Sequence, residues 1–124
     1  MTHSVKISTL WIVVLMNLIF ADVLSFMYPS ALAEISTGTV EGVVITPLFL
    51  LIAAVLTEIP IAMIFLSRSL GRPLGRIANL VAVVVTILFV VGGGSLKLHY
   101  LFLAGVEVIA MVYIAWLAWT WPKD

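Results

Sequence analysis

The chain has 124 residues, of which 64% are hydrophobic and only 10% are charged, whereas an ordinary soluble domain is about half apolar and about a quarter charged. Six basic residues balance six acidic ones, which leaves no positive field for nucleic acid and no polybasic run for anionic lipid. The sequence contains no cysteine, and this excludes disulfides, thiol redox chemistry and thiolate metal sites. The composition therefore predicts an integral membrane protein.

Four apolar runs are each long enough to cross a bilayer, for which a helix needs about 20 residues. Trp11 and Tyr28 lie near the ends of the first run, where amphipathic rings favour the membrane interface. The runs occupy most of the chain, so residues 1–124 are expected to form a single integral membrane domain. The sequence thus predicts an all-α bundle of four transmembrane helices. The expected spans cover about residues 7–28, 43–67, 74–94 and 98–121.

The segments between the runs have the composition of loops. Residues 30–42 are small and polar and predict an external loop with one interfacial turn. Residues 68–76 place three arginines, two glycines and a proline between apolar runs, which predicts a tight turn. A run of glycines, residues 92–94, is expected to end the third span. Inside the second span, Pro60 is expected to bend the helix within one turn of Glu58.

An alternative interpretation of the first run is a secretory signal peptide. Lys6 precedes the run, and residues 31–33 have the small-x-small form of a cleavage site. The run is longer than the usual signal core of about 7 to 15 residues, and it carries Asn17 and Asp22. These features favour a membrane span.

The basic residues predict the orientation of the bundle. Lysine and arginine near membrane helices are enriched on the cytoplasmic side. In the predicted topology Lys6, the arginines of residues 68–76 and Lys123 lie on one side, and Lys97 alone lies on the other. We therefore expect both termini in the cytoplasm.

Polar side chains interrupt the apolar runs, and the helical rise of about 1.5 Å per residue gives each a depth from the cytoplasmic edge. Asn17 and Glu58 are expected at roughly 14 Å and roughly 12 Å, and Asp22 and Glu107 at roughly 21 Å and roughly 20 Å. An ionisable group near mid-membrane costs about 2.5 to 3.5 kcal/mol. These four residues are therefore expected to face the bundle interior as a polar cluster.

No basic residue lies at the depth of these acids, so the cluster cannot be neutralised by salt bridges within the chain. One solution is that a carboxyl group carries a proton at neutral pH and donates a hydrogen bond to another. A water-filled cavity or a bound cation is a second solution. Both indicate a site for a proton, a cation or a cationic ligand. The alternative is that protonated acids and asparagine only join helices by hydrogen bonds.

The sequence contains no arrangement typical of an enzyme or a metal site. His3 and His99 fall near opposite membrane edges, so they cannot ligate one haem. Ser67 and Ser69 lack a nearby base, and no triad of nucleophile, histidine and acid can be assembled. We expect no catalytic residue, no cofactor and no metal.

Several short motifs carry a family resemblance: Leu10-Trp11, Asp22, Thr57–Met63, Asn79, Glu107 and the ending Ala118–Pro122. With them the chain resembles a family of small four-helix bacterial membrane proteins known only as a domain of unknown function. The likeness covers nearly the whole chain and implies a multi-pass protein of the bacterial inner membrane, without an activity, substrate or cofactor. In size and layout alone the chain also resembles small four-helix multidrug exporters, which work as dimers and carry a glutamate in the first helix. Here the acid of the first run is Asp22, late in the run.

Two functions remain open from the sequence. One is a small proton- or cation-linked transporter or ligand-binding protein that uses the polar cluster. The other is a structural or accessory membrane subunit whose acids only join helices. The expected partners are membrane lipid, a second copy of the chain and an unidentified small molecule or ion.

Overall fold

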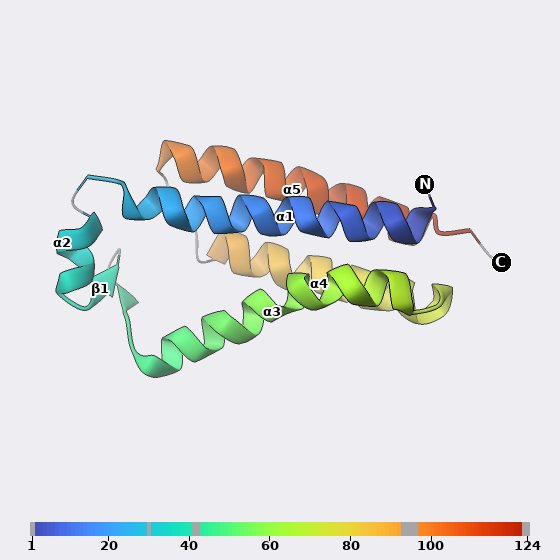
Figure 1. Ribbon diagram of the computed structural model, residues 1–124, viewed down its shortest axis with the longest axis horizontal. Coiled ribbons are helices and arrows are strands. Elements are labelled where there is room, and N and C mark those ends of the chain that lie inside the picture. The colour runs from blue at the N-terminus through green and yellow to red at the C-terminus, as the bar shows by residue number, and fades with distance from the viewer. Residues whose placement is uncertain (1, 30, 41–42, 93–96, 123–124) are drawn as a thin grey trace.

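The computed structural model describes residues 2–29, 31–40, 43–92 and 97–122, and its four long helices form a bundle (Figure 1). Each of the four is long and apolar enough to cross a membrane. The predicted fold class, an all-α bundle of four such helices, is confirmed. The long helices are α1 (His3–Phe26), α3 (Pro47–Ser69), α4 (Arg72–Gly92) and α5 (Leu98–Trp119).

The first two long helices begin at residues that cap them, and these positions differ from the predicted spans. The Thr2 hydroxyl accepts a hydrogen bond from the Val5 N–H (3.3 Å), so α1 begins before the apolar run does. The Thr46 hydroxyl accepts one from the Phe49 N–H (3.0 Å). Pro47 then opens α3, where its missing N–H costs nothing.

The connection between α1 and α3 has more structure than the predicted loop. It contains the short helix α2 (Ala31–Ser36) and a two-stranded antiparallel ladder of β1 (Thr39–Val40) and β2 (Val43–Val44). Gly38, between α2 and β1, adopts a φ of 81°, a conformation that glycine accepts without strain. The predicted second span therefore began too early, because residues 43–44 belong to this ladder.

The four long helices form a ring in which each packs against two others. α1 and α4 both pack against α3 and α5, so α3 lies diagonally opposite α5. Both termini and the α3–α4 turn lie at one end of the bundle, and α2 lies at the other (Figure 1). α4 ends at Gly92, and the two glycines that follow it lie outside the described residues.

The helix α3 bends in its middle. Figure 1 shows its C-terminal half running beside the bundle and its N-terminal half diverging from it. Pro60 lies inside the helix and is buried. A proline in a helix interior removes one hydrogen bond and clashes with the preceding turn, which bends the helix. The predicted bend is confirmed.

A buried hydrogen-bond network joins α1, α3 and α4. The Asn79 Oδ1 accepts from the Trp11 Nε1 (2.8 Å) and from the Ser67 Oγ (3.2 Å), and the Asn79 Nδ2 donates to the Gly75 carbonyl (2.8 Å). The side chains of Trp11, Ser67 and Asn79 are fully buried. Trp11 is thus a core residue and not the interface residue predicted from its place near the end of the run, because its N–H has a buried acceptor.

Two arginines of α4 attach it to the C-terminal end of α5. The Arg76 Nε donates to the Ala118 carbonyl (3.0 Å), and its Nη2 donates to the Trp119 carbonyl (3.2 Å). The Arg72 Nε donates to the Trp121 carbonyl (2.8 Å). The last carbonyls of a helix have no partner within it, so these guanidinium groups cap α5. The arginine-rich segment and the tryptophan-rich ending are therefore parts of one contact.

The Trp121 indole packs directly on Gly75, where an added Cβ would lie 2.9 Å from two ring carbons. We expect Gly75→Ala to lower the free energy of unfolding by about 1 to 3 kcal/mol, because a rigid ring must move. Gly105→Ala is the matched control, since a Cβ there meets nothing within 4 Å. Thermal unfolding in detergent measures both. Equal stability of the two variants would contradict the packing of Trp121.

Candidate functional site

Glu107 of α5 and Thr86 of α4 are buried polar residues without complete hydrogen bonding. Their side chains are 2% and 1% exposed. The Glu107 Oε1 and the Thr86 Oγ1 are the only buried side-chain oxygen or nitrogen atoms in the described ranges that lack a hydrogen-bond partner. An unsatisfied buried polar group costs about 1 to 3 kcal/mol, and a charged group costs more. The burial of these two unbonded atoms therefore lowers the stability of the bundle.

Thr86 and Glu107 lie within one helical turn of the same level on two adjacent helices. The bond between Arg76 and the Ala118 carbonyl fixes the register of α4 against α5. Thr86 lies ten residues after Arg76, and Glu107 lies eleven residues before Ala118. Counted from this bond, the two levels agree within about 1.5 Å, the rise of one residue. Counted from the bond that the Tyr100 hydroxyl donates to the Val90 carbonyl (3.0 Å), they differ by about 4.5 Å. A hydroxyl and a carboxyl group thus lie within one turn of the same level in the bundle interior.

Asp22 of α1 is the second acid of the site. Its carboxyl group interacts electrostatically with that of Glu107. The Ser25 Oγ and the His99 Nε2 are 3.1 Å apart, which fixes α1 against α5. Asn17 lies eight residues before Ser25, and Glu107 lies eight residues after His99. Counted from this contact, the backbone of Glu107 is level with that of Asn17, and the backbone of Asp22 lies about 7 Å farther toward the α2 end.

The other two predicted members of the cluster stand apart. Asn17 is half-buried, and its Nδ2 donates to the Val13 carbonyl of its own helix (2.8 Å). Glu58 is exposed on α3, the helix diagonally opposite Glu107. The four residues do not form one cluster within a single chain, because depth along a helix does not determine the direction in which a side chain points. In the described part of the chain no three acidic or histidine side chains could hold a metal ion.

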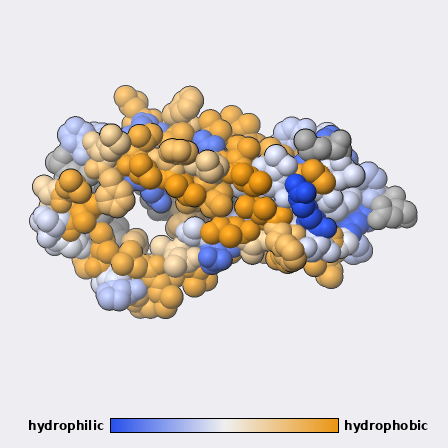
Figure 2. Space-filling model, viewed as in Figure 1, coloured by the Kyte–Doolittle hydropathy of each residue, from blue (hydrophilic) through white to orange (hydrophobic). Residues whose placement is uncertain are grey.

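The bundle is open at its α2 end. Figure 2 shows a hollow between the outer part of α1, the α2 segment and the diverging half of α3. Asp22 lies on this outer part of α1 and is exposed. At the same end, the Lys97 ammonium lies 4.4 Å from the centre of the Tyr28 ring. Of the two acids, Asp22 is therefore the exposed one and lies nearer to the α2 end.

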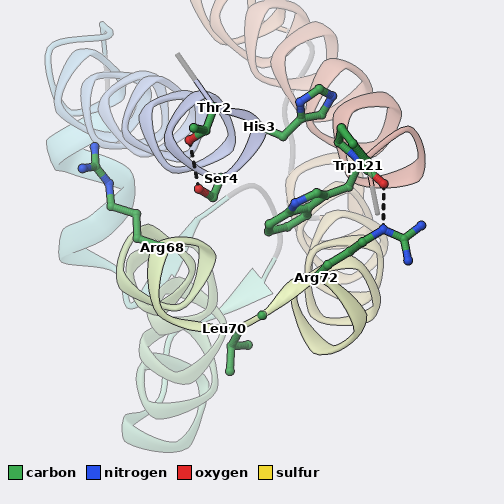
Figure 3. Close-up of a pocket in the computed structure, with 9 residues that line it drawn as sticks. Thr2, His3, Ser4, Arg68, Leu70, Arg72 and Trp121 are labelled. Atoms are coloured by element: carbon green, nitrogen blue, oxygen red, sulfur yellow. Dashed lines mark hydrogen bonds between the residues drawn. The ribbon is translucent and has the colours of Figure 1, made fainter. Parts of the chain in front are cut away.

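A pocket of about 420 Å³ lies at the opposite end, where both termini are found. Figure 3 shows the Trp121 indole along one wall, Thr2 and Ser4 along another, and the guanidinium groups of Arg68 and Arg72 directed outward. From Glu107 to the end of α5 at Trp119 is about 18 Å. This pocket is therefore separate from the buried acid.

Four helices that can each cross a membrane, with an acid enclosed among them, place the protein in the class of multi-pass membrane proteins. The chain belongs to a family of unknown function, DUF6326, whose sequence profile matches residues 2–124. This confirms the resemblance to a domain of unknown function. No curated protein and no solved structure matches the chain.

Proposed function

We propose that this protein is a multi-pass protein of the bacterial inner membrane in which Glu107 takes up and releases a proton or a small cation during transport. The observation that supports this most is the Glu107 carboxyl group, which is 2% exposed with its Oε1 unbonded. A lone carboxylate in a membrane interior is costly. The group is therefore expected to hold a proton or a cation. The buried Thr86 hydroxyl, within one turn of the same level, would offer a cation a second oxygen ligand.

The proposed membrane orientation rests on charge. The arginines of residues 68–76 lie at the end that holds both termini, and Lys97 lies at the other. Under the positive-inside rule the termini then face the cytoplasm and the α2 end faces outward. The assignment to a bacterial inner membrane rests on the short motifs that the chain shares with small bacterial membrane proteins.

In this proposal Asp22 is the entry to the site. It is exposed on the half of α1 nearer to α2 and interacts electrostatically with Glu107. A negative charge at the mouth of a low-dielectric site raises the local concentration of cations. A proton or cation arriving from the α2 end would reach Asp22 first and Glu107 about 7 Å deeper.

Proton or cation flux into liposomes that contain the pure protein tests the proposal. We expect Glu107→Gln to reduce flux to the level of empty liposomes, because it removes the titrating group and keeps the shape. Asp22→Asn should slow flux by about tenfold or less, since it removes one attracting charge worth about 1 kcal/mol. Glu58→Gln is the control, because Glu58 lies on the helix diagonally opposite. Unchanged flux in Glu107→Gln would overturn the proposal.

A structural or accessory subunit is the second candidate, and the Asn79 network favours it. There a buried amide joins three helices, and both its oxygen and its nitrogen make hydrogen bonds, as expected of polar residues that only hold membrane helices together. Glu107 differs from Asn79 because its Oε1 makes no such bond. A protein with no flux under any ion gradient would favour this second function.

A further inference from the structure

The exposed face of α3 has the residue spacing of a helix–helix seam. Six exposed residues follow one another at alternating intervals of three and four, which is the spacing of the a and d positions of a coiled coil. The same packing geometry is common between transmembrane helices. These residues, here called the α3 stripe, are Leu48, Leu51, Val55, Glu58, Ala62 and Phe65.

The α3 stripe differs from a surface that only faces lipid because an ionisable residue lies at its centre. A stripe of the same spacing on α4 is apolar throughout, as lipid requires. In the α3 stripe, Glu58 lies one turn from Val55 and one turn from Ala62 and is exposed. A carboxyl group that faces lipid at this depth costs about 2.5 to 3.5 kcal/mol. The α4 residues are Leu74, Ile77, Val81, Val84, Leu88 and Val91.

The helix α3 is also the least covered of the four spans. Within its most apolar stretch 11% of residues are buried, against 28% to 33% in the other three helices. From Pro47 to Glu58 no described side chain is buried, and Figure 1 shows this half diverging from the bundle. The half of α3 that ends at Glu58 is thus only partly covered by the described residues.

We propose that a second copy of this chain packs on the α3 stripe, with the two Glu58 side chains in contact across a twofold axis. Such an axis along the membrane normal brings each residue of the stripe to its own equivalent at the same depth. A protonated carboxyl group that donates to a carboxylate is self-complementary, so Glu58 needs no basic partner. In the described part of the chain the lysines and arginines lie near the ends of helices, away from Glu58. A single polar pair in an apolar seam then fixes the register of the dimer. This inference does not depend on the proposed transport function.

Cysteine cross-linking in membranes tests the interface, because the natural chain has no cysteine. We expect Val55→Cys and Ala62→Cys to form disulfide-linked dimers at least tenfold more efficiently than Val84→Cys. Val84 on α4 is a matched control: it is 58% exposed, as is Val55. It also lies at the depth of Ala62, five residues beyond the bond between Ser67 and Asn79. Equal cross-linking of all three variants overturns the proposal, as does cross-linking of Val84→Cys alone.

A charge exchange tests the role of Glu58 in the same interface. Two copies of Glu58→Lys repel one another, so capture of one tagged copy by another is expected to fall at least tenfold. Coexpression of Glu58→Lys with the parent chain should restore capture, since one lysine then meets one glutamate. Glu58→Gln should keep the dimer, because two amides also pair with each other. Undiminished capture between Glu58→Lys copies, or no recovery with the parent, overturns the assignment of Glu58 to the seam.

Discussion

Replacing Asn79 by leucine is expected to lower the free energy of unfolding by about 2 to 4 kcal/mol, because two buried donors lose their acceptor. The Trp11 Nε1 and the Ser67 Oγ both donate to the Asn79 Oδ1. Neither side chain is exposed to solvent that could replace the bond. Leucine fills a similar volume, so the loss reports the hydrogen bonds more than the packing.

Unfolding of the purified protein in detergent, followed by circular dichroism, measures this loss. Asn17→Leu is the matched control, since among the described residues the Asn17 amide bonds to the backbone of its own helix alone, and it is half-buried. We expect that control to change stability by less than about 1 kcal/mol. If both leucine variants were equally stable, Asn79 would not be the residue that joins the three helices.

The second large effect is expected at Glu107, where leucine should stabilise the bundle and abolish ion transfer. The Glu107 Oε1 is buried without a hydrogen bond, and removal of such a group returns about 1 to 3 kcal/mol. A gain in stability together with a loss of activity is typical of a residue kept for function.

Thermal unfolding and liposome flux of the same Glu107→Leu preparation check this prediction. Thr86→Val is the companion variant, because it removes the other unbonded oxygen and keeps the branched shape. We expect it to be as stable as the parent or more so. A clear loss of stability in Glu107→Leu would indicate that the carboxyl group joins helices, as the accessory-subunit function requires.

The positions of the four long helices could be predicted from the sequence, because span length and turn composition depend on local chemistry. The turn between α3 and α4 falls within the predicted residues 68–76, but it consists of Leu70 and Gly71 alone, because the three arginines lie in the two helices. Pro60 lies in the bent helix, as predicted. The predicted start of this span, residue 43, was less accurate. The apolar run does continue upstream through Val43–Val44, but these residues pair with another strand. Only the capping by Thr46 and the position of Pro47 mark where the strand ends and the helix begins.

The direction of each polar side chain could not be predicted in the same way. In helices that are apolar all round, no amphipathic pattern shows which face is buried. Glu58 and Glu107 therefore looked equivalent in the sequence, although one is exposed and the other enclosed. Thr86 was not predicted as a site residue, because a threonine in a membrane helix costs little free energy. Its depth relative to Glu107, counted along the chain, was the signal that could have identified it.

The most direct test of the central claim is whether Glu107 itself gains and loses a proton or exchanges it for a cation. Infrared difference spectra of the protein in lipid, recorded between acidic and alkaline conditions, detect the carbonyl band of a protonated carboxyl group. The account predicts a band that is absent from Glu107→Gln and altered in Asp22→Asn, because the two acids interact. A difference spectrum that is the same in the parent and in Glu107→Gln would contradict it.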